Sequence, residues 1–306
     1  MGLFDKLIRR TSQNHDEEVK SKGFEIADCS FDCESCDSKF PASLKFDDEA
    51  DLWNSTKPYG LHFIVSTGKT DWAHDATGES NTLSHSVSKW AGNNAGNFVG
   101  LESSAIKTSV SSLSSDELLI NDDYKQELVG DILVLPFFIW IKNIHLNQVD
   151  EFLSTFIPKL IEFRAQNLTS LNFDSFKQEF PTIKLEVDTF KSYVFLCSHK
   201  HRDKRCGITA PIMKKEIEIH LRDLQLYRDV GDNTPNGVKV AFINHIGGHK
   251  FSANVIIYLR NSGKNIWLAR CRPNNVRPII DQCILNDGKI WPDNVRLIQK
   301  FHHIEW

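Results

Sequence analysis

The 306-residue sequence predicts an α/β protein built from two similar domains. Short apolar runs of the kind that form buried strands alternate with segments whose apolar residues recur at helical spacing. The length accommodates two ordinary domains of about 100–150 residues each. An internal repeat relates the first half of the chain to the second. Hydrophobic residues make up 41% and charged residues 25%, which is typical of a soluble globular protein.

Charge and hydropathy exclude two classes of partner. A net charge of -4 argues against a surface for nucleic acid. No apolar run approaches the roughly 20 residues that cross a bilayer, so we expect no membrane span. Residues 1–10 can form a short amphipathic helix, but Asp5 and Glu17 spoil the acid-poor pattern of a mitochondrial presequence. The expected location is therefore the cytoplasm, with the nucleus as a second compartment.

Residues 1–45 are expected to form a polar segment, loosely held over its first 23 residues, that contains Cys29, Cys33 and Cys36. The chain has seven cysteines and no recognisable secretion signal, which favours a reducing compartment over a disulfide framework. Three thiolates at this spacing can ligate zinc or part of an iron–sulfur centre, although no fourth ligand lies nearby in the sequence. Redox-active thiols and plain reduced cysteines remain alternatives.

The first domain is expected over residues 46–180. The triplet Gly-Lys-Thr at 68–70 resembles part of a phosphate loop, but Phe63 occupies the position of its required first glycine. We therefore expect no nucleotide site. The predicted elements are a strand at 60–66, a loop at 67–75, a flexible serine-rich surface segment at 103–115, one buried strand at 130–141 broken by Pro136, a helix at 147–165 kinked at Pro158, and an interdomain connection at 166–181.

The second domain is expected over residues 181–306. Its elements follow the order strand, helix, three strands, helix, which suits a thioredoxin-like layer fold. The first domain is then a degenerate thioredoxin-like copy. In this repeat, residues 64–69 align with 195–200, Asp75 aligns with Cys206, and 133–138 align with the strand before His245. The predicted elements are strands at 192–196, 238–243, 254–259 and 266–270, helices at 211–229 and 274–285, a loop at 197–206 and a hairpin turn at 261–264.

Two pairs of metal-binding residues follow the strand ends of the second domain. Cys197 and Cys206 are separated by eight residues, and His245 and His249 by three. Together they form a Cys2His2 set on flexible connections at the end of a rigid sheet. The residues at 247 and 248 are both glycine, Gly247 and Gly248, so the backbone can approach a bulky cofactor between the histidines.

Zinc and a [2Fe–2S] cluster are the two candidates for this site. Zinc accepts two thiolates and two imidazoles, but its structural cysteines usually lie two to four residues apart. The wider gap favours a bulkier group, as in Rieske centres, which hold [2Fe–2S] through two cysteines and two histidines. His199 and His201 are expected to support the ligands or to face solvent. Four basic residues between the cysteines would offset negative charge on the ligands: Lys200, Arg202, Lys204 and Arg205.

The pattern Cys-x8-Cys followed by His-Ile-Gly-Gly-His resembles the sucrase/ferredoxin-like family of fungi. The resemblance covers most of the chain, including the N-terminal cysteine segment. It implies a C-terminal thioredoxin-like ferredoxin domain whose [2Fe–2S] cluster is held by Cys197, Cys206, His245 and His249. It does not imply glycosidase chemistry, because the sequence singles out no pair of carboxylates of the kind that reaction needs.

The last three residues, Ile304, Glu305 and Trp306, form a second recognisable feature. They resemble the C-terminal tripeptide through which cytosolic iron–sulfur proteins are recruited to the targeting complex of the assembly machinery. This resemblance implies that complex as a partner. The remaining cysteines, Cys271 and Cys283, are expected to be core thiols.

Together these features predict a cytosolic [2Fe–2S] protein for one-electron transfer, with an electron donor and an acceptor that the sequence does not name. Imidazole ligands raise the reduction potential and can titrate, so the transfer can be coupled to proton uptake. An electron carrier is favoured over a self-sufficient enzyme. Two alternatives stay open: a thiol-redox enzyme of thioredoxin type that uses the N-terminal cysteines, and a structural zinc-binding interaction module.

Overall fold

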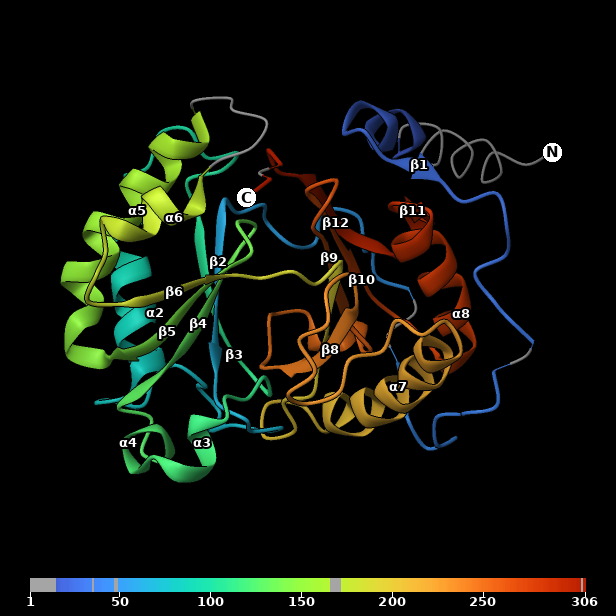
Figure 1. Cartoon of the computed structure of the whole chain (residues 1–306). Coiled ribbons are helices and arrows are strands. Elements are labelled where there is room, and N and C mark those ends of the chain that lie inside the picture. The colour runs from blue at the N-terminus through green and yellow to red at the C-terminus, as the bar shows by residue number, and fades with distance from the viewer. Residues whose placement is uncertain (1–14, 35, 47–48, 166–171, 304) are drawn as a thin grey trace.

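The computed structural model describes residues 15–34, 36–46, 49–165, 172–303 and 305–306 (Figure 1). The helices are α2 (Leu83–Asn94), α3 (Glu117–Ile120), α4 (Asp122–Lys125), α5 (Val149–Ala165), α6 (Phe173–Gln178), α7 (Lys204–Asp223) and α8 (Val276–Pro278), which continues as a π-helix (Ile279–Leu285). The strands are β1 (Glu25–Ile26), β2 (Leu61–Ser66), β3 (Ile106–Ser111), β4 (Val129–Leu135), β5 (Ile139–His145), β6 (Lys184–Val187), β7 (Ser192–Cys197), β8 (Val238–Ile243), β9 (Val255–Leu259), β10 (Lys264–Leu268), β11 (Lys289–Ile290) and β12 (Val295–Lys300).

The protein is a mixed α/β molecule organised around one 10-stranded sheet, in the order β12-β10-β9-β7-β8-β3-β2-β4-β5-β6. In the first half of the sheet, β2 pairs in parallel with β3 and antiparallel with β4. In the second half, β7 pairs in parallel with β8 and antiparallel with β9. The halves join where β3 and β8 pair antiparallel, through Ser111 and Ile243. The same pairing pattern therefore occurs twice within a continuous sheet.

The repeated pairing corrects part of the predicted internal repeat. The alignment of the β2 region with the β7 region agrees with the structure, because each is the second strand from the β3–β8 seam and pairs in parallel with the seam strand of its half. The strand before His245, however, is β8, and its counterpart is β3 rather than residues 133–138 of β4. The error arose because β3 lies within the serine-rich segment that was predicted to be flexible. Its two serines are buried and hydrogen-bonded instead: the Ser109 hydroxyl lies 2.9 Å from Nε2 of His62, and the Ser111 hydroxyl donates to the Phe242 carbonyl over 2.7 Å.

The residues of each strand alternate between two packing layers, as the period-2 geometry of a strand requires. On the face of the sheet that the helices cover, Phe63 and Val65 pack beneath α2 and α5 in the first half. Val194 and Leu196 pack beneath α7 and the π-helix in the second half. Figure 1 shows these two groups of helices on opposite sides of the molecule. The opposite face of the sheet carries a third cluster to which both halves contribute, including Ile64, Leu133, Tyr193, Phe195 and Trp267.

Several predicted elements differ from the observed ones in their bounds. Helix α7 begins at Lys204 rather than at 211, because the side chain of Asp203 caps it by accepting the backbone N–H of Arg205. Pro211 consequently lies inside the helix. The single strand predicted at 130–141 is a hairpin of β4 and β5 that turns at residues 136–138. The strands predicted at 192–196 and 238–243 are confirmed as β7 and β8.

The N-terminal segment lies against the second half of the sheet. Residues 15–21 are helical, and Val19 is fully buried in the core beneath α7. β1 then pairs in parallel with β11, which follows the π-helix. The prediction of a loosely held segment is therefore wrong for residues 15–23, while residues 1–14 lie outside the described chain. Within the residues that the structure describes, no helix has the length and apolar character needed to cross a membrane.

Candidate metal centre

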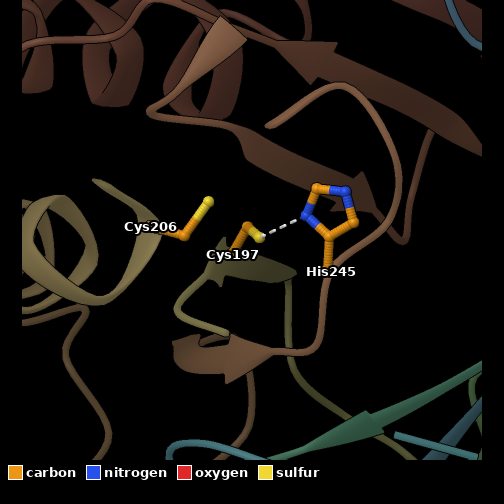
Figure 2. A group of neighbouring side chains, drawn as sticks. All are labelled: Cys197, Cys206 and His245. Carbon is orange, nitrogen blue, oxygen red and sulfur yellow. Dashed lines mark hydrogen bonds between the residues drawn. The ribbon is translucent and has the colours of Figure 1, made fainter. Parts of the chain in front are cut away.

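Three of the four predicted ligands come together at the carboxyl end of the parallel strand pair β7–β8 (Figure 2). Cys197 is the last residue of β7 and stands opposite Ile243, the last residue of β8. His245 follows β8 two residues later, so the strand register brings it beside Cys197. Cys206 lies in the first turn of α7 rather than in a loop. Capping of α7 at Asp203 therefore orients this ligand.

The donor atoms of these three residues converge. The Cys197 sulfur lies 3.8 Å from Nδ1 of His245, and one donor atom from each residue falls within 4.8 Å of the others. Both cysteines are buried, whereas His245 is partly exposed at the edge of the site. His249 opens the short 3-10 segment His249–Phe251, but its side chain lies outside the described ones. The structure thus brings together three predicted ligands and leaves the fourth untested.

The two thiols form a polarised pair. Hydrogen bonds from the Cys197 thiol and from His245 lower the pKa of Cys206 to about 5, against the opposing effect of burial. The neighbouring Cys206 sulfur, together with burial, raises the pKa of Cys197 well above its usual range. The Ser252 hydroxyl, 3.8 Å from the Cys206 sulfur, also favours the thiolate. The hydrogen bonds to the Cys206 sulfur therefore favour a thiolate within this pair.

A buried arginine that the sequence analysis missed holds the turn between the histidines. The Arg296 guanidinium, on β12, donates to the Gly247 carbonyl over 2.9 Å and to Oδ1 of Asn254 over 2.8 Å. Burial lowers the pKa of Arg296 to about 10, so the group stays cationic at neutral pH. A Cβ at Gly248 would lie 2.4 Å from Nη2 of Arg296. The second glycine of the turn thus makes room for this cation rather than for a cofactor.

The predicted role of the basic loop between the cysteines is only partly met. Arg205 forms a salt bridge with Asp203 over 2.8 Å, and Arg202 contacts the ring of His74. These two cations are consequently engaged away from the ligands. Arg296, more than 90 residues away in the sequence, is instead the buried cation whose pKa responds to the charge of Cys197. Only a tertiary contact could have revealed it, since no motif surrounds Arg296.

His199 positions one ligand by a hydrogen bond to its backbone. Nδ1 of the buried His199 accepts the backbone N–H of His245 over 3.2 Å, so Nε2 carries the proton and donates to the Ala73 carbonyl over 2.8 Å. Burial lowers the pKa of His199, which keeps the ring neutral in this role. His201, by contrast, is exposed and pairs with Asp71. As expected, one of these histidines supports a predicted ligand and the other faces solvent: His199 contacts the backbone of His245, and His201 is exposed.

The donor set fits a [2Fe–2S] group, because buried thiolates and imidazole nitrogens are the ligands of Rieske-type clusters. A buried cation and hydrogen-bonded sulfurs also suit an anionic centre. A single tetrahedral zinc ion would accept the same three donors, since ligand sulfur and nitrogen on one such ion lie about 3.6 Å apart. Geometry alone therefore agrees with both candidate metals.

Comparison with known proteins assigns the chain to a family. A family model described as sucrase/ferredoxin-like matches residues 52–297, which include β2 to β11, the first half of β12 and all four predicted ligands. The chain belongs to the sucrase/ferredoxin-like family. This assignment agrees with the resemblance carried by the Cys-x8-Cys and His-Ile-Gly-Gly-His patterns.

Relatives within the sucrase/ferredoxin-like family differ in how much of the chain they match. Actin patches distal protein 1 of Saccharomyces cerevisiae is 36% identical over 278 residues, which cover 90% of this chain and 84% of that protein. Altered inheritance of mitochondria protein 32 of Clavispora lusitaniae is 33% identical over 156 residues, 51% of this chain and 49% of that protein. The same-named protein of Meyerozyma guilliermondii is 32% identical over 111 residues, 36% of each chain. A search of solved structures found no match to this chain.

The C-terminal tail of this family member docks on the first half of the molecule. The indole N–H of Trp306 donates to the Phe137 carbonyl over 2.9 Å. Its ring packs against Phe163 and Phe173, with centroids 5.9 and 5.2 Å apart. Ile304 lies outside the described residues, and Glu305 is exposed. The predicted targeting tripeptide thus ends in a side chain that is partly buried.

The cysteines outside the centre fall into two groups. Cys271 and Cys283 are fully buried, which confirms the prediction of core thiols, and burial raises the pKa of each. Among the N-terminal cysteines, Cys29 is exposed, while Cys36 is buried against α7. The N-terminal cysteines therefore do not contribute to the centre at Cys197.

Proposed function

We propose that this protein is a [2Fe–2S] electron carrier whose cluster is held by Cys197, Cys206, His245 and His249. The observation that carries the proposal is the convergence of two buried cysteine sulfurs and one imidazole nitrogen at the end of β7 and β8, in a chain of the sucrase/ferredoxin-like family. A cluster bound here would accept and release one electron at a time.

The surrounding residues support such a role by their charge and placement. Arg296 supplies a buried positive charge, which favours thiolate ligands and an anionic centre. Ser252 donates toward Cys206, and hydrogen bonds to sulfur raise a reduction potential. His245 is partly exposed and Gly247 is exposed, so this turn is the side on which an electron donor or acceptor would approach. Both of those partners are unidentified.

We infer further that each half of the sheet is a thioredoxin-like unit, the first one degenerate. In each half a central strand pairs in parallel with the strand that follows the first helix, and antiparallel with the next strand. The first half lacks equivalents of the metal-binding residues, because Ser66 stands at the end of β2 where Cys197 stands at the end of β7. It would serve as a scaffold, and His199 anchors the centre to its loop.

The tail extends the proposal to assembly of the cluster. We propose that residues 304–306 recruit the cytosolic targeting complex that inserts iron–sulfur clusters, which would locate the protein in the cytosol. Recruitment would require Trp306 to leave its contacts with Phe163 and Phe173.

Electron paramagnetic resonance tests the cluster directly. Anaerobically purified protein, reduced with dithionite, should give a [2Fe–2S] signal with a low average g value. The His245→Cys and His249→Cys variants should shift that signal toward the shape of an all-cysteine ferredoxin, because thiolates replace the neutral imidazoles. His201→Cys is the matched control, since His201 is exposed and pairs with Asp71.

Two other outcomes would reject the proposal. Colourless, signal-free protein with zinc bound at Cys197 and Cys206 would make the centre a structural zinc module. Colourless protein without metal, whose activity is lost on alkylation of exposed thiols, would favour a thiol-redox enzyme. A normal signal that is unchanged in both histidine variants would retain the cluster but exclude histidine ligation.

A further inference from the structure

A second cluster of metal-binding side chains lies at the far end of α7. Glu216 and His220 are four residues apart, so they share one face of the helix. Oε1 of Glu216 lies 3.2 Å from Nε2 of His220. Glu216 is almost fully buried, although a carboxylate is costly to bury without a strong partner. Glu216 is about 15 Å and His220 about 21 Å along the helix from Cys206, at 1.5 Å per residue, so the pair is separate from the first centre.

The N-terminal segment brings two cysteines to this helix face. Cys36 is buried, and its sulfur lies 3.6 Å from the same Nε2 atom of His220. Cys33 neighbours it: the hydrogen bond and the charge of Cys33 both act on the Cys36 thiol. The backbone N–H of Cys33 donates to the Asn274 carbonyl over 2.7 Å, which fixes the segment against the region before α8. Cys36 therefore faces the Glu-His pair, and Cys33, at zinc-knuckle spacing, lies beside Cys36.

The distances match those that one tetrahedral ion imposes on its ligands. Zinc binds sulfur at about 2.3 Å and nitrogen or oxygen at about 2.0–2.1 Å, which at the tetrahedral angle separates sulfur from nitrogen by about 3.6 Å and nitrogen from oxygen by about 3.3 Å. The observed separations are 3.6 Å and 3.2 Å. Donor atoms of Cys36, Glu216 and His220 all lie within 4.8 Å of one another. The group is thus small enough for one ion.

We infer that Cys33, Cys36, Glu216 and His220 form a structural site for one zinc ion. The Cys-x2-Cys spacing, together with one imidazole and one carboxylate, provides four ligands of the types that zinc accepts. The ion would tie the N-terminal segment to α7, the helix whose first turn carries Cys206. An open cavity of about 680 Å³ borders Glu216 and His220 and gives an ion a route of entry.

The protonation state of the metal-free cluster is consistent with such a site. Burial, together with the nearby Cys33 and Glu216, raises the pKa of Cys36 to about 11. Without a cation this thiol therefore stays protonated at neutral pH. A bound divalent ion reverses the balance, because its charge favours the thiolate and neutralises the carboxylate. Binding would release the thiol proton of Cys36.

Metal analysis of the full-length, cluster-containing protein tests this inference. We expect about one zinc per chain in addition to the iron of the first centre. Cys36→Ser and His220→Ala should each lose the zinc and keep the iron. Cys206→Ser should do the opposite, which separates failure of this site from failure of the first centre. Cys29→Ser is the matched control, because Cys29 is an exposed cysteine of the same segment.

Two further measurements on the unmodified protein test the zinc site even if a variant fails to fold. Zinc X-ray absorption of the unmodified protein should show a mixed shell of two sulfurs with nitrogen or oxygen. Treatment with a zinc chelator should speed cleavage by trypsin at the exposed Lys39, next to the knuckle. Unmodified protein without zinc, or with a Cys33–Cys36 disulfide after anaerobic purification, would overturn the inference. So would zinc that stays in Cys36→Ser and leaves in Cys206→Ser.

Discussion

At the scale of single residues, the two glycines between the histidines have different roles. Both have positive φ, +87° at Gly247 and +68° at Gly248. A Cβ at Gly247 meets nothing within 4 Å, whereas one at Gly248 would collide with the Arg296 guanidinium. Substitutions at these two glycines can therefore distinguish two effects. Backbone strain would arise at both positions, whereas displacement of the buried Arg296 guanidinium would arise only at Gly248.

Gly248→Ala should reduce cluster retention and stability well beyond Gly247→Ala. We expect an additional loss of about 1–3 kcal/mol in the free energy of unfolding, which is the usual cost of overpacking. Urea unfolding of the metal-free proteins and the rate of cluster loss to a chelator measure the two effects. Equal losses in the two variants would show that Arg296 adjusts freely and does not fix the turn.

A second prediction at the scale of single residues concerns His62 and the pH dependence of the free energy of unfolding. The ring is fully buried, with Nδ1 2.7 Å from the Tyr258 hydroxyl and Nε2 2.9 Å from the Ser109 hydroxyl. Burial, aided by the charge of Lys107, lowers the pKa of His62 well below its usual value. In the unfolded chain the ring binds a proton below about pH 6.5, while in the folded protein it stays neutral.

The contribution of His62 to the free energy of unfolding is therefore fully present above about pH 6.5. It declines as the pH falls below that value toward the lower pKa of the folded state. The decline is at most about 1.4 kcal/mol per pH unit for one group. His62→Gln cannot titrate, so urea unfolding at pH 7 and pH 5 should show a smaller pH difference than in the unmodified protein. An unaltered slope in His62→Gln would contradict the prediction.

At the scale of elements, the seam between β3 and β8 joins the two halves of the sheet. Its regular pairing is short, and side chains extend it. The Asn244 side chain accepts the backbone N–H of Val110 over 3.1 Å, and the Ser112 hydroxyl accepts that of Phe242 over 2.9 Å. Because Asn244 directly precedes His245, the seam also positions the turn that carries this ligand.

Asn244→Ala should weaken the seam and the centre together. The substitution leaves the buried N–H of Val110 without its acceptor, which costs about 1–3 kcal/mol of folding free energy. Cluster loss to a chelator should accelerate in parallel with the fall in the urea midpoint. Asn93→Ala is the control, since Asn93 is exposed near the C-terminal end of α2. A stable variant that loses its cluster rapidly would assign Asn244 to the centre alone.

At the scale of the whole molecule, the tail of the second half rests on the aromatic cluster of the first. Trp306 contacts Phe163, Phe173 and Phe176 there. The chain's end thus has two candidate roles, packing and recruitment of the assembly machinery. These roles make opposite demands, because packing holds the indole in place and recruitment needs it released.

Deletion of Trp306 should lower iron occupancy severalfold in cells without altering clusters reconstituted in the test tube. Phe173→Ala keeps the tripeptide but removes the nearest ring, 5.2 Å from Trp306. It should therefore maintain or raise iron occupancy in cells. Iron content of protein purified from cells, against the reconstituted samples, measures both variants. An equal fall in the two would assign the tail to packing rather than recruitment.

The sequence by itself determined the α/β class, the strands that precede the candidate site and the three residues that converge there, Cys197, Cys206 and His245. These features are local: an apolar run specifies a buried strand, and the residues that break the run lie at its end. Such inferences need no knowledge of distant contacts. The cap at Asp203 was equally local, although we expected the helix to begin at Pro211 instead.

Only the tertiary structure decided the features that depend on partners far apart in the chain. β3 is polar enough to resemble a loop, and it is a strand because β2 and β8 satisfy its hydrogen bonds. Arg296 contacts the turn that follows His245 from another strand, so no spacing in the sequence predicts this contact. Cys36 lies beside Glu216 and His220 of α7, and no spacing in the sequence connects these residues. Burial and convergence arise when the chain folds, which is why local patterns do not contain them.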